Sequence, residues 1–410
     1  MNRDVVITGM GAVTPIGSGL ETFWKGLLEG RNGIDEITLF DAREYPCRIA
    51  AEVKDWDPSV FMSRKKARRM ARCAQFAVAA SQLCLEDAQW RREPPSSRTA
   101  VVGSISNSAQ EILDRIIEKL KTRGYHRLSP RSLPMTLPHS SASEVGAVTG
   151  FQGEVTSVTN ACAAGLYAVG HAANLIRAGK YDAILCPATE ASITYTTLGS
   201  FARAGLLSVR NDEPEKASRP FDAKRDGGII GEGAACFLLE SEEHARKRAA
   251  NVYAQVNGFG CSESHGCDTD EGTQQGMMAS MREALVSGNC SPAHVGYVGA
   301  NGVSDPDLDR LETAALKELF QEEAYRTPVS SVKAQVGIAL NVAGALQLIA
   351  SVMALNTGIL PPTRNYEYPD PACDLDYIPG EPRHNAVSHA LVHAHGMNGS
   401  NASLLITKAY

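Results

Sequence analysis

One cysteine stands in a context suited to nucleophilic chemistry. Cys162 lies between a predicted strand over 154–158 and a predicted alanine-rich helix over 166–178, which Gly179 closes. The unpaired N–H groups and the positive dipole end of a helix favour a thiolate at such a position. The sequence therefore predicts a lowered thiol pKa and a nucleophilic sulfur, with small neighbours that let a substrate approach. The alternative is an inert, buried cysteine, the commoner state of a free thiol.

The composition is that of an ordinary globular protein, with 43% apolar and 21% charged residues over 410 positions. A net charge of -6 argues against bulk affinity for nucleic acid or an anionic membrane. No apolar run reaches the roughly 18 residues that span a bilayer, and the N-terminus shows no signal-peptide segment. Ten cysteines are scattered without a CxxC pair. We therefore expect a reduced, cytoplasmic protein with neither a metal site nor a disulfide framework.

The elements around Cys162 include strands that are apolar along their whole length. Such strands are buried on both faces, which indicates a layered α/β fold. In the first half we predict helices over 20–29 and 62–87 and strands over 4–9, 99–104, 182–186 and 234–240, with a glycine turn after the first strand. The second half repeats this order, with helices over 308–319 and 341–355 and strands over 252–256, 295–299, 328–331, 389–393 and 402–407.

Two segments carry clustered basic residues. The predicted helix over 62–87 starts with a basic run, which is either a solvated helix face or a docking surface for an acidic partner. A long excursion over 107–150 adds further lysines and arginines together with three prolines. An excursion of this length usually covers a site or a subunit contact.

Five motifs occur in an order that is typical of one family. The first is Val5-Val6-Ile7-Thr8-Gly9-Met10-Gly11 followed by Thr14-Pro15-Ile16-Gly17, and the second is Ala161-Cys162-Ala163-Ala164-Gly165. The others are Arg219-Pro220-Phe221-Asp222 with Arg225-Asp226-Gly227 and Gly231-Glu232-Gly233, then Val329-Ser330-Ser331-Val332-Lys333, and finally Gly399-Ser400-Asn401-Ala402. Together they span nearly the whole chain and resemble the β-ketoacyl-acyl-carrier-protein synthases of the thiolase superfamily, on the elongating (type II) side.

This resemblance implies a thiolase-like five-layer αβαβα fold made of two pseudo-duplicated halves, 1–243 with the nucleophile and 244–410. It also implies a dimer in which Cys162 is acylated by a chain carried on the phosphopantetheine of acyl carrier protein. A malonyl unit is then decarboxylated and condensed with that chain. The resemblance implies no other cofactor and no metal. It places Lys333 at the position of a lysine in the family's site.

The chain departs from the family at both histidines of the site. Asn301 stands at the position of the first and Ile338 at the position of the second. Decarboxylation of a malonyl thioester develops an enolate, whose oxygen needs hydrogen-bond donors aimed at it. An asparagine amide can still donate, whereas isoleucine cannot. Because loss of one such donor typically costs about 100- to 1000-fold in rate, loss of both should leave little condensation.

The segment that resembles the family's acyl-channel gate also differs. Met397 stands at the gate position, and His395 replaces the aromatic residue that precedes it. His393 and His395 are expected near the site, where they could take over the lost role. The alternative is that both are ordinary packed histidines.

A site that keeps Cys162 and Lys333 but lacks both histidines resembles a chain-length-factor subunit. Such a subunit pairs with an active ketosynthase, as a heterodimer or heterotetramer, in type II polyketide, polyene or fatty-acid-like elongation. Familiar chain-length factors have lost the cysteine, often to glutamine, and this chain has not. The alternatives are an acyl or malonyl transferase, or a condensing enzyme, that uses Cys162 with a non-standard site. A lyase or hydrolase of acyl thioesters is a more remote reading.

Carrier proteins are acidic, so their docking surface is expected to be basic. The residues we predict for acyl carrier protein binding are Arg64, Lys65, Lys66, Arg68, Arg69, Arg127 and Arg131.

Overall fold

The computed structural model describes residues 3–91, 98–265 and 269–409. Its main sheet has the order β11-β10-β14-β15-β9-β1-β8-β7-β5-β6, with β2 paired to β1. The first half contributes β1 (Val5–Thr14), β5 (Thr99–Ser104), β6 (Val155–Val158), β7 (Ala183–Glu190) and β8 (Gly233–Ser241). The second half contributes β9 (Ala254–Glu263), β10 (Tyr297–Gly299), β11 (Val329–Ser330), β14 (His389–His395) and β15 (Ser400–Lys408).

The two halves have the same topology. Counted along the chain within each half, the strands lie in the order third, second, fourth, fifth, first. In both halves the fourth strand pairs in parallel with the second and antiparallel with the fifth. The halves join where β1 pairs antiparallel with β9, with Ile7 opposite Ala254. The predicted pseudo-duplication is therefore present in the fold, and the connection between the halves carries the short helix α10 (Glu242–Lys247).

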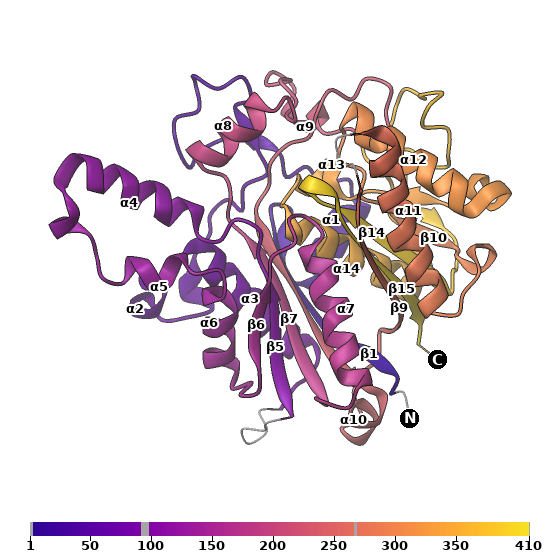
Figure 1. Ribbon diagram of the computed structural model, residues 1–410, viewed down its shortest axis with the longest axis horizontal. Coiled ribbons are helices and arrows are strands. Elements are labelled where there is room, and N and C mark those ends of the chain that lie inside the picture. The colour runs from indigo at the N-terminus through magenta and orange to yellow at the C-terminus, as the bar shows by residue number, and fades with distance from the viewer. Residues whose placement is uncertain (1–2, 92–97, 266–268, 410) are drawn as a thin grey trace.

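Helices separate and cover the two halves of the sheet, as Figure 1 shows. The helices α7 (Ala164–Arg177) and α14 (Asn341–Thr357) contact strands of both halves and lie between them. The outer face of the first half is covered by α3 (Arg72–Asp87) and α6 (Ser140–Thr149), and that of the second half by α11 (Asp270–Ser287) and α12 (Pro306–Phe320). This arrangement confirms the predicted five-layer α/β fold.

Shorter elements complete the described chain. They are β2 (Gly17–Ser18), α1 (Leu20–Leu28), β3 (Asp35–Glu36), β4 (Ile49–Ala50), η1 (Pro58–Val60), α2 (Arg64–Ala67), α4 (Gln110–Arg123), η2 (Tyr125–Arg127), α5 (Ser132–Thr136), α8 (Tyr195–Arg203), α9 (Pro214–Ala217), η3 (Pro292–His294), η4 (Gln321–Tyr325), α13 (Lys333–Val336), β12 (Ile359–Leu360), β13 (Arg383–His384) and η5 (Met397–Gly399). Within the described ranges, no helix is both long enough and apolar enough to cross a membrane.

The glycine turn predicted after residue 9 is wrong, because β1 continues to Thr14. The glycines serve close packing instead. A Cβ atom on Gly11 would lie 2.1 Å from the carbonyl oxygen of Ala80, and one on Gly9 would lie 2.6 Å from Cβ of Ala88. The first strand therefore passes directly beneath the end of α3, where only glycine fits.

The single helix predicted over 62–87 is two helices, α2 and α3. Ser63 caps the first by accepting a hydrogen bond from the backbone N–H of Lys66. The chain then becomes extended at Ala71, so that Arg72 turns inward and binds the buried carboxylate of Glu232 at 2.6 Å. The burial of this ion pair separates Arg72 from the exposed part of the basic run.

The excursion over 107–150 forms α4, η2, α5 and α6. In Figure 1, α4 and the chain that follows it extend away from the body of the molecule, and α6 returns onto α3. Several apolar side chains on this excursion are exposed, namely Ile117, Leu120, Tyr125, Leu133 and Leu137.

Candidate active site around Cys162

Cys162 stands in a tight turn between β6 and α7. Ala161 has a left-handed backbone with φ of 44°, which is unfavourable for a residue with a side chain. Hydrogen bonds hold this conformation: Ala164 N–H donates to the carbonyl of Ala161 at 3.2 Å, and Ser106 Oγ donates to the same carbonyl at 2.9 Å. A backbone held in such a conformation by its surroundings is typical of functional sites.

The loop that follows β14 approaches this turn closely. A Cβ atom on Gly396 would lie 2.9 Å from the backbone nitrogen of Cys162. The absence of a side chain lets the backbone N–H of Met397 reach the sulfur, where it favours the thiolate. Met397 is 49% exposed at the mouth of the site. The N–H groups of Met397 and of Cys162 itself are therefore placed to stabilise negative charge at this point.

The predicted low pKa of the Cys162 thiol is wrong. Burial raises the pKa to about 11, and the nearby Lys333 and the Met397 N–H oppose this only in part. The cause is an apolar wall formed by Val303, Ile338 and Leu340, against which Cys162 packs. Removal of water from around the sulfur outweighs the effect of the helix N-terminus, because desolvation disfavours the charged form.

Lys333 lies in the interior behind the turn. Its Nζ donates to the carbonyl of Asn301, and burial lowers its pKa. The carboxylate of Glu312, on α12, accepts the backbone N–H groups of Asn301 at 2.7 Å and of Gly302 at 2.8 Å. Burial raises the pKa of Glu312, and the charges of Glu312 and Lys333 stabilise each other. This pair fixes the backbone of the segment that starts at Asn301.

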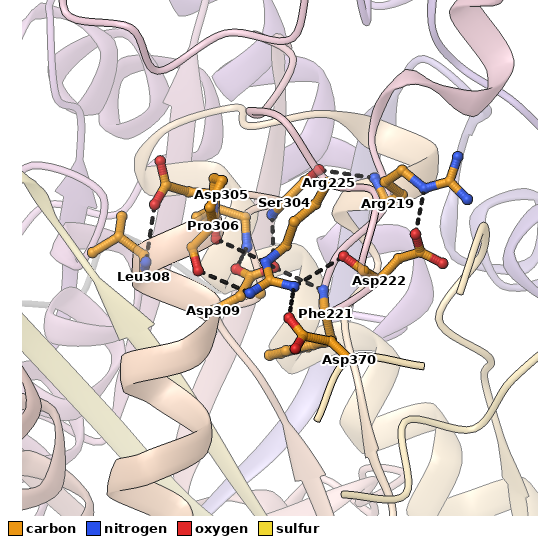
Figure 2. A network of polar contacts seen from close by, with 12 residues as sticks. Arg219, Phe221, Asp222, Arg225, Ser304, Asp305, Pro306, Leu308, Asp309 and Asp370 are labelled. Carbon is orange, nitrogen blue, oxygen red and sulfur yellow. Dashed lines mark hydrogen bonds and ion pairs between the residues drawn. The ribbon is translucent and has the colours of Figure 1, made fainter. Parts of the chain in front are cut away.

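A second buried acid holds the rest of that segment. Asp309 accepts the N–H groups of Val303 at 2.8 Å, Ser304 at 3.1 Å and Phe221 at 2.8 Å, and burial raises its pKa to about 6. Figure 2 shows how this network continues into the motif over 219–227. The paired groups are Arg219 with Asp222 at 2.8 Å and Arg225 with Asp370 at 2.6 Å and Asp309 at 3.9 Å. The motif anchors the site and contributes no group to the thiol.

The two positions predicted to align with the family's histidines differ in the hydrogen-bond donors that they offer. Asn301 is 2% exposed, and its Oδ1 accepts the backbone N–H of His395 at 3.2 Å. This contact orients the side-chain amide, whose nitrogen has no hydrogen-bond partner among the described residues and remains able to donate. Ile338 offers no polar group and forms part of the wall against Cys162. One donor is therefore partly retained and the other is lost.

The two histidines of β14 have different environments. His395 is half-buried, and its Nδ1 lies 2.8 Å from Oδ1 of Asn401. Because the amide nitrogen of Asn401 donates to Ser264 and Gly399, its oxygen is the acceptor, and Nδ1 of His395 carries the proton. Burial lowers the pKa of His395, so its Nε2 is unprotonated at neutral pH. As a neutral imidazole in this tautomer, it is an acceptor and does not replace a lost donor.

His393 is completely buried. Its Nδ1 lies 3.0 Å from Ser403 Oγ, which contacts Ser280 on α11, and its Nε2 has no partner in the described chain. Burial lowers its pKa to about 3. The side chain is a packed histidine, in agreement with the alternative reading of the sequence.

The predicted carrier-protein residues lie on two segments, of which Arg69 and Arg131 line one cavity. Arg64, Lys65, Arg68 and Arg69 are exposed around α2, and Lys66 is half-buried. Arg127 and Arg131 are exposed on the excursion. A cavity of about 430 Å³ is lined by both Arg69 and Arg131, so the fold brings the two basic segments together. Arg72 lies apart from them, in its pair with Glu232.

Sequence reasoning missed the polar groups beneath the turn. Glu190 is fully buried at the end of β7, and Asn341 is fully buried at the start of α14. The available signal was a glutamate that ends an otherwise apolar strand, a position where an unneeded charge would be costly.

Comparisons with known proteins agree along the whole chain. Residues 2–245 match the family description "Beta-ketoacyl synthase, N-terminal domain", and residues 253–367 match "Beta-ketoacyl synthase, C-terminal domain". A 3-oxoacyl-[acyl-carrier-protein] synthase 2 of Coxiella burnetii is 37% identical over 410 residues, which cover 100% of this chain and 99% of that protein.

Two solved structures share the fold over their full length. One is described as "The ishigamide ketosynthase/chain length factor", with a TM-score of 0.93 and 29% identity over 100% of both chains. The other is a type II PKS acyl-carrier protein in complex with its ketosynthase bound to the hexaketide, with a TM-score of 0.91 and 28% identity over 100% of both chains.

Proposed function

This chain belongs to the β-ketoacyl synthase family, and from that premise we propose that it is a chain-length-factor subunit. It pairs with an active ketosynthase as a heterodimer or heterotetramer and supports chain elongation on acyl carrier protein in a type II polyketide, polyene or fatty-acid-like system. Ketosynthases take substrates held on the phosphopantetheine of the carrier and need no added cofactor. The pairing is also supported by the full-length likeness to a structure described as a ketosynthase/chain length factor.

The observation that carries this proposal is that an isoleucine, Ile338, packs against the thiol where a hydrogen-bond donor is expected. Decarboxylation needs donors at the enolate oxygen and space for the malonyl carboxylate. An aliphatic wall gives neither, because a carboxylate in such a place would lose its water without gaining a partner. The chain therefore contributes surface and shape to a complex whose condensation takes place on the partner's cysteine.

A second candidate function is thioester exchange at Cys162. It is favoured by the retained turn and by the two backbone N–H groups near the sulfur. The thiolate would attack the carrier-bound thioester carbonyl, forming a new C–S bond and releasing the pantetheine thiol. This step needs an oxyanion hole and no histidine donor.

Mass spectrometry separates the two functions. Wild type and Cys162→Ala are incubated with acyl- and malonyl-carrier protein, alone and with the co-expressed ketosynthase, and intact masses and product formation are recorded. The partner-subunit proposal expects no adduct on the chain alone and full activity of the complex with Cys162→Ala. An acyl adduct that disappears in Cys162→Ala, together with loss of product in the complex, would instead support thioester exchange.

Restoration of the two histidines tests the site itself. The double variant Asn301→His with Ile338→His is expected to regain malonyl decarboxylation, measured as carbon dioxide release from malonyl-carrier protein. A matched control is Val303→His, which places an imidazole in the same wall at a position that is not a histidine in the family. A folded double variant with no more activity than this control would contradict the proposed roles of positions 301 and 338.

Carrier-protein docking is tested by charge reversal. Lys65→Glu with Arg69→Glu is expected to weaken binding of acyl carrier protein about tenfold or more at low salt, since two favourable contacts become repulsive. The control is Lys247→Glu on α10, whose side chain is 70% exposed and lies away from α2. Equal affinities of the two variants at low ionic strength would show that the carrier docks elsewhere.

A further inference from the structure

A second turn in the molecule has the backbone geometry of the Cys162 turn. Leu340 precedes α14 with φ of 44°, the same value as Ala161 before α7. In both turns the carbonyl of the left-handed residue accepts the N–H of the residue three positions later. Ala164 donates to Ala161 at 3.2 Å, and Ala343 donates to Leu340 at 3.1 Å. The residue that follows the left-handed position is Cys162 in the first turn and Asn341 in the second. Asn341 is therefore the counterpart of Cys162 in the duplicated fold.

The two turns touch at the centre of the molecule. A Cβ atom on Gly165, three residues after Cys162, would lie 2.3 Å from the carbonyl oxygen of Asn341. A Cβ atom on Gly344, three residues after Asn341, would lie 3.3 Å from Cγ of Leu166. The first turns of α7 and α14 therefore pack directly on each other. A side chain that is bound by the Asn341 turn can lie close to the Cys162 turn.

Glu190 is the group that Asn341 holds. Its Oε2 accepts Asn341 Nδ2 at 2.9 Å and Ser106 N–H at 2.9 Å, and its Oε1 accepts Ser192 Oγ at 2.7 Å and Asn107 N–H at 3.4 Å. All four donors are neutral. Unlike Glu232, which pairs with Arg72 at 2.6 Å, Glu190 lies beyond ion-pair distance of every described basic side chain.

A continuous set of hydrogen bonds links Glu190 to the thiol-bearing turn. Glu190 fixes the backbone of Ser106, and the Ser106 hydroxyl donates to the carbonyl of Ala161, the residue with the left-handed backbone. On the other side, Ser104 Oγ donates to Oδ1 of Asn341 at 2.8 Å, which orients the amide nitrogen toward Glu190. A buried carboxylate without a counter-ion lowers the stability of the fold, so its presence beneath the turn indicates a role in the site.

We propose that Glu190, held by Asn341, is a positioning residue that fixes Ser106 under the Cys162 turn and keeps a negative charge beneath the thiol. The charge disfavours ionisation of Cys162 from one side, while Lys333 favours it from the other. Among the described residues, the charge of Glu190 also acts on the buried thiol of Cys73 on α3, whose pKa it raises. Cys162 is thus kept protonated by the residues around it, whether or not the chain is paired with a ketosynthase, so the inference goes beyond the proposed function.

The test is the pH dependence of alkylation of Cys162 in the full chain. Glu190→Gln keeps the shape and an acceptor for Ser106 and Asn341, while Ser192 Oγ can turn to accept from the new amide. Burial places the pKa of Glu190 at about 7, so in wild type it is charged throughout the range above pH 8. Removal of this charge is expected to lower the thiol midpoint by about one pH unit. Because a less basic thiolate is a weaker nucleophile, the net gain in rate at pH 9 is about threefold.

Iodoacetamide labelling is followed by peptide mass spectrometry, which reports each cysteine separately. Cys290 is half-buried and lies between α11 and η3, so its labelling rate serves as an internal reference. Glu240→Gln is the matched control, since Glu240 is another fully buried carboxylate. It lies on β8 and forms ion pairs with Arg248 and His244. It should leave Cys162 labelling unchanged.

A milder variant covers the case in which Glu190→Gln does not fold. Ser106→Ala removes one hydroxyl and should slow Cys162 labelling about threefold at every pH, with the same midpoint, because the turn loosens while the charge remains. The inference is overturned if folded Glu190→Gln labels with the wild-type pH profile. It is also overturned if Ser106→Ala labels like wild type.

Discussion

The turns before α7 and α14 share one backbone conformation but differ in the environment of the residue that follows it. Each places a residue after a left-handed position and presents it at the end of a central helix. In the first turn that residue is a half-buried cysteine, reached by the loop after β14. In the second it is a fully buried amide that makes hydrogen bonds in three directions. Duplication supplied the same geometry twice, and the side chain at the apex decides whether the turn meets a substrate or supports its neighbour.

A similar contrast separates the charged residues that anchor the loops of the site from the residues near the thiol. Asp309 and the two arginines of the motif over 219–227 keep their ion pairs (Figure 2), and Glu312 accepts two backbone N–H groups. Ile338, which packs against Cys162, is predicted to replace a histidine of the family. The anchoring network is therefore intact around a site in which Ile338 offers no hydrogen-bond donor. Such a pattern is expected of a subunit that keeps its shape for a partner.

The largest effect should come from the glycines at which the two turns touch. Gly165→Ala is expected to lower the free energy of unfolding by roughly 3 kcal/mol, because the new methyl group would meet a backbone carbonyl at 2.3 Å. Gly344→Ala meets only side chains, the nearest at 3.0 Å, and should change it by about 1 kcal/mol or less. Urea unfolding of the two variants measures the difference. Equal losses would show that the contact between the turns is not as close on the α7 side.

The next largest effect on the unfolding free energy should come from the residues that follow the two left-handed positions, Asn341 and Cys162. Asn341→Ala is expected to cost about 2 kcal/mol of unfolding free energy, because it leaves Ser104 and one oxygen of Glu190 with fewer partners in the interior. Cys162→Ala removes one sulfur atom from a half-buried residue and should cost less than about 1 kcal/mol. Both are measured by urea unfolding at pH 7.5. A larger loss for Cys162→Ala would reverse the assignment of the supporting role.

The pH dependence of stability isolates the charge beneath the thiol. Burial raises the pKa of Glu190 from 4.5 to about 7, so between these values the folded state holds a proton that the unfolded state releases. Stability from this group is therefore lost as pH rises through that window and is constant above it. Glu190→Gln should remove a fall of about 2 kcal/mol between pH 5 and pH 7.5. An unchanged slope in thermal or urea unfolding would mean that Glu190 is ionised across the whole range.

The smallest effect should come from the strained position itself. Ala161→Gly is expected to stabilise the fold by about 0.5 kcal/mol, because glycine adopts a positive φ without the penalty of a Cβ atom but has more freedom when unfolded. Ala163→Gly, two residues on and with an ordinary φ of -76°, should destabilise instead. Calorimetric melting temperatures of the pair give the sign of each change. Destabilisation of both by the same amount would show that the turn is not strained.

Much of the fold could be read from the sequence because its strands and motifs carry local signals. The run over 99–104, with an apolar centre, predicts a buried strand, and the strand β5 occupies the predicted residues. The prediction was wrong where packing overrides local pattern. Gly9 and Gly11 suggest a turn by type but lie in a strand under α3, and the helix over 62–87 is broken because Arg72 turns inward to Glu232.

The family and the layered fold could be predicted from the residues of the motifs alone, and the absence of histidine at two expected positions stays a prediction from the same motifs. Only the tertiary structure decided how the thiol behaves. The helix N-terminus predicts an acidic thiol, yet the wall around Ile338 and the charge of Glu190 raise its pKa. These groups come from distant parts of the chain. Electrostatic and solvation effects depend on distance in space, which the order of residues along a chain does not give.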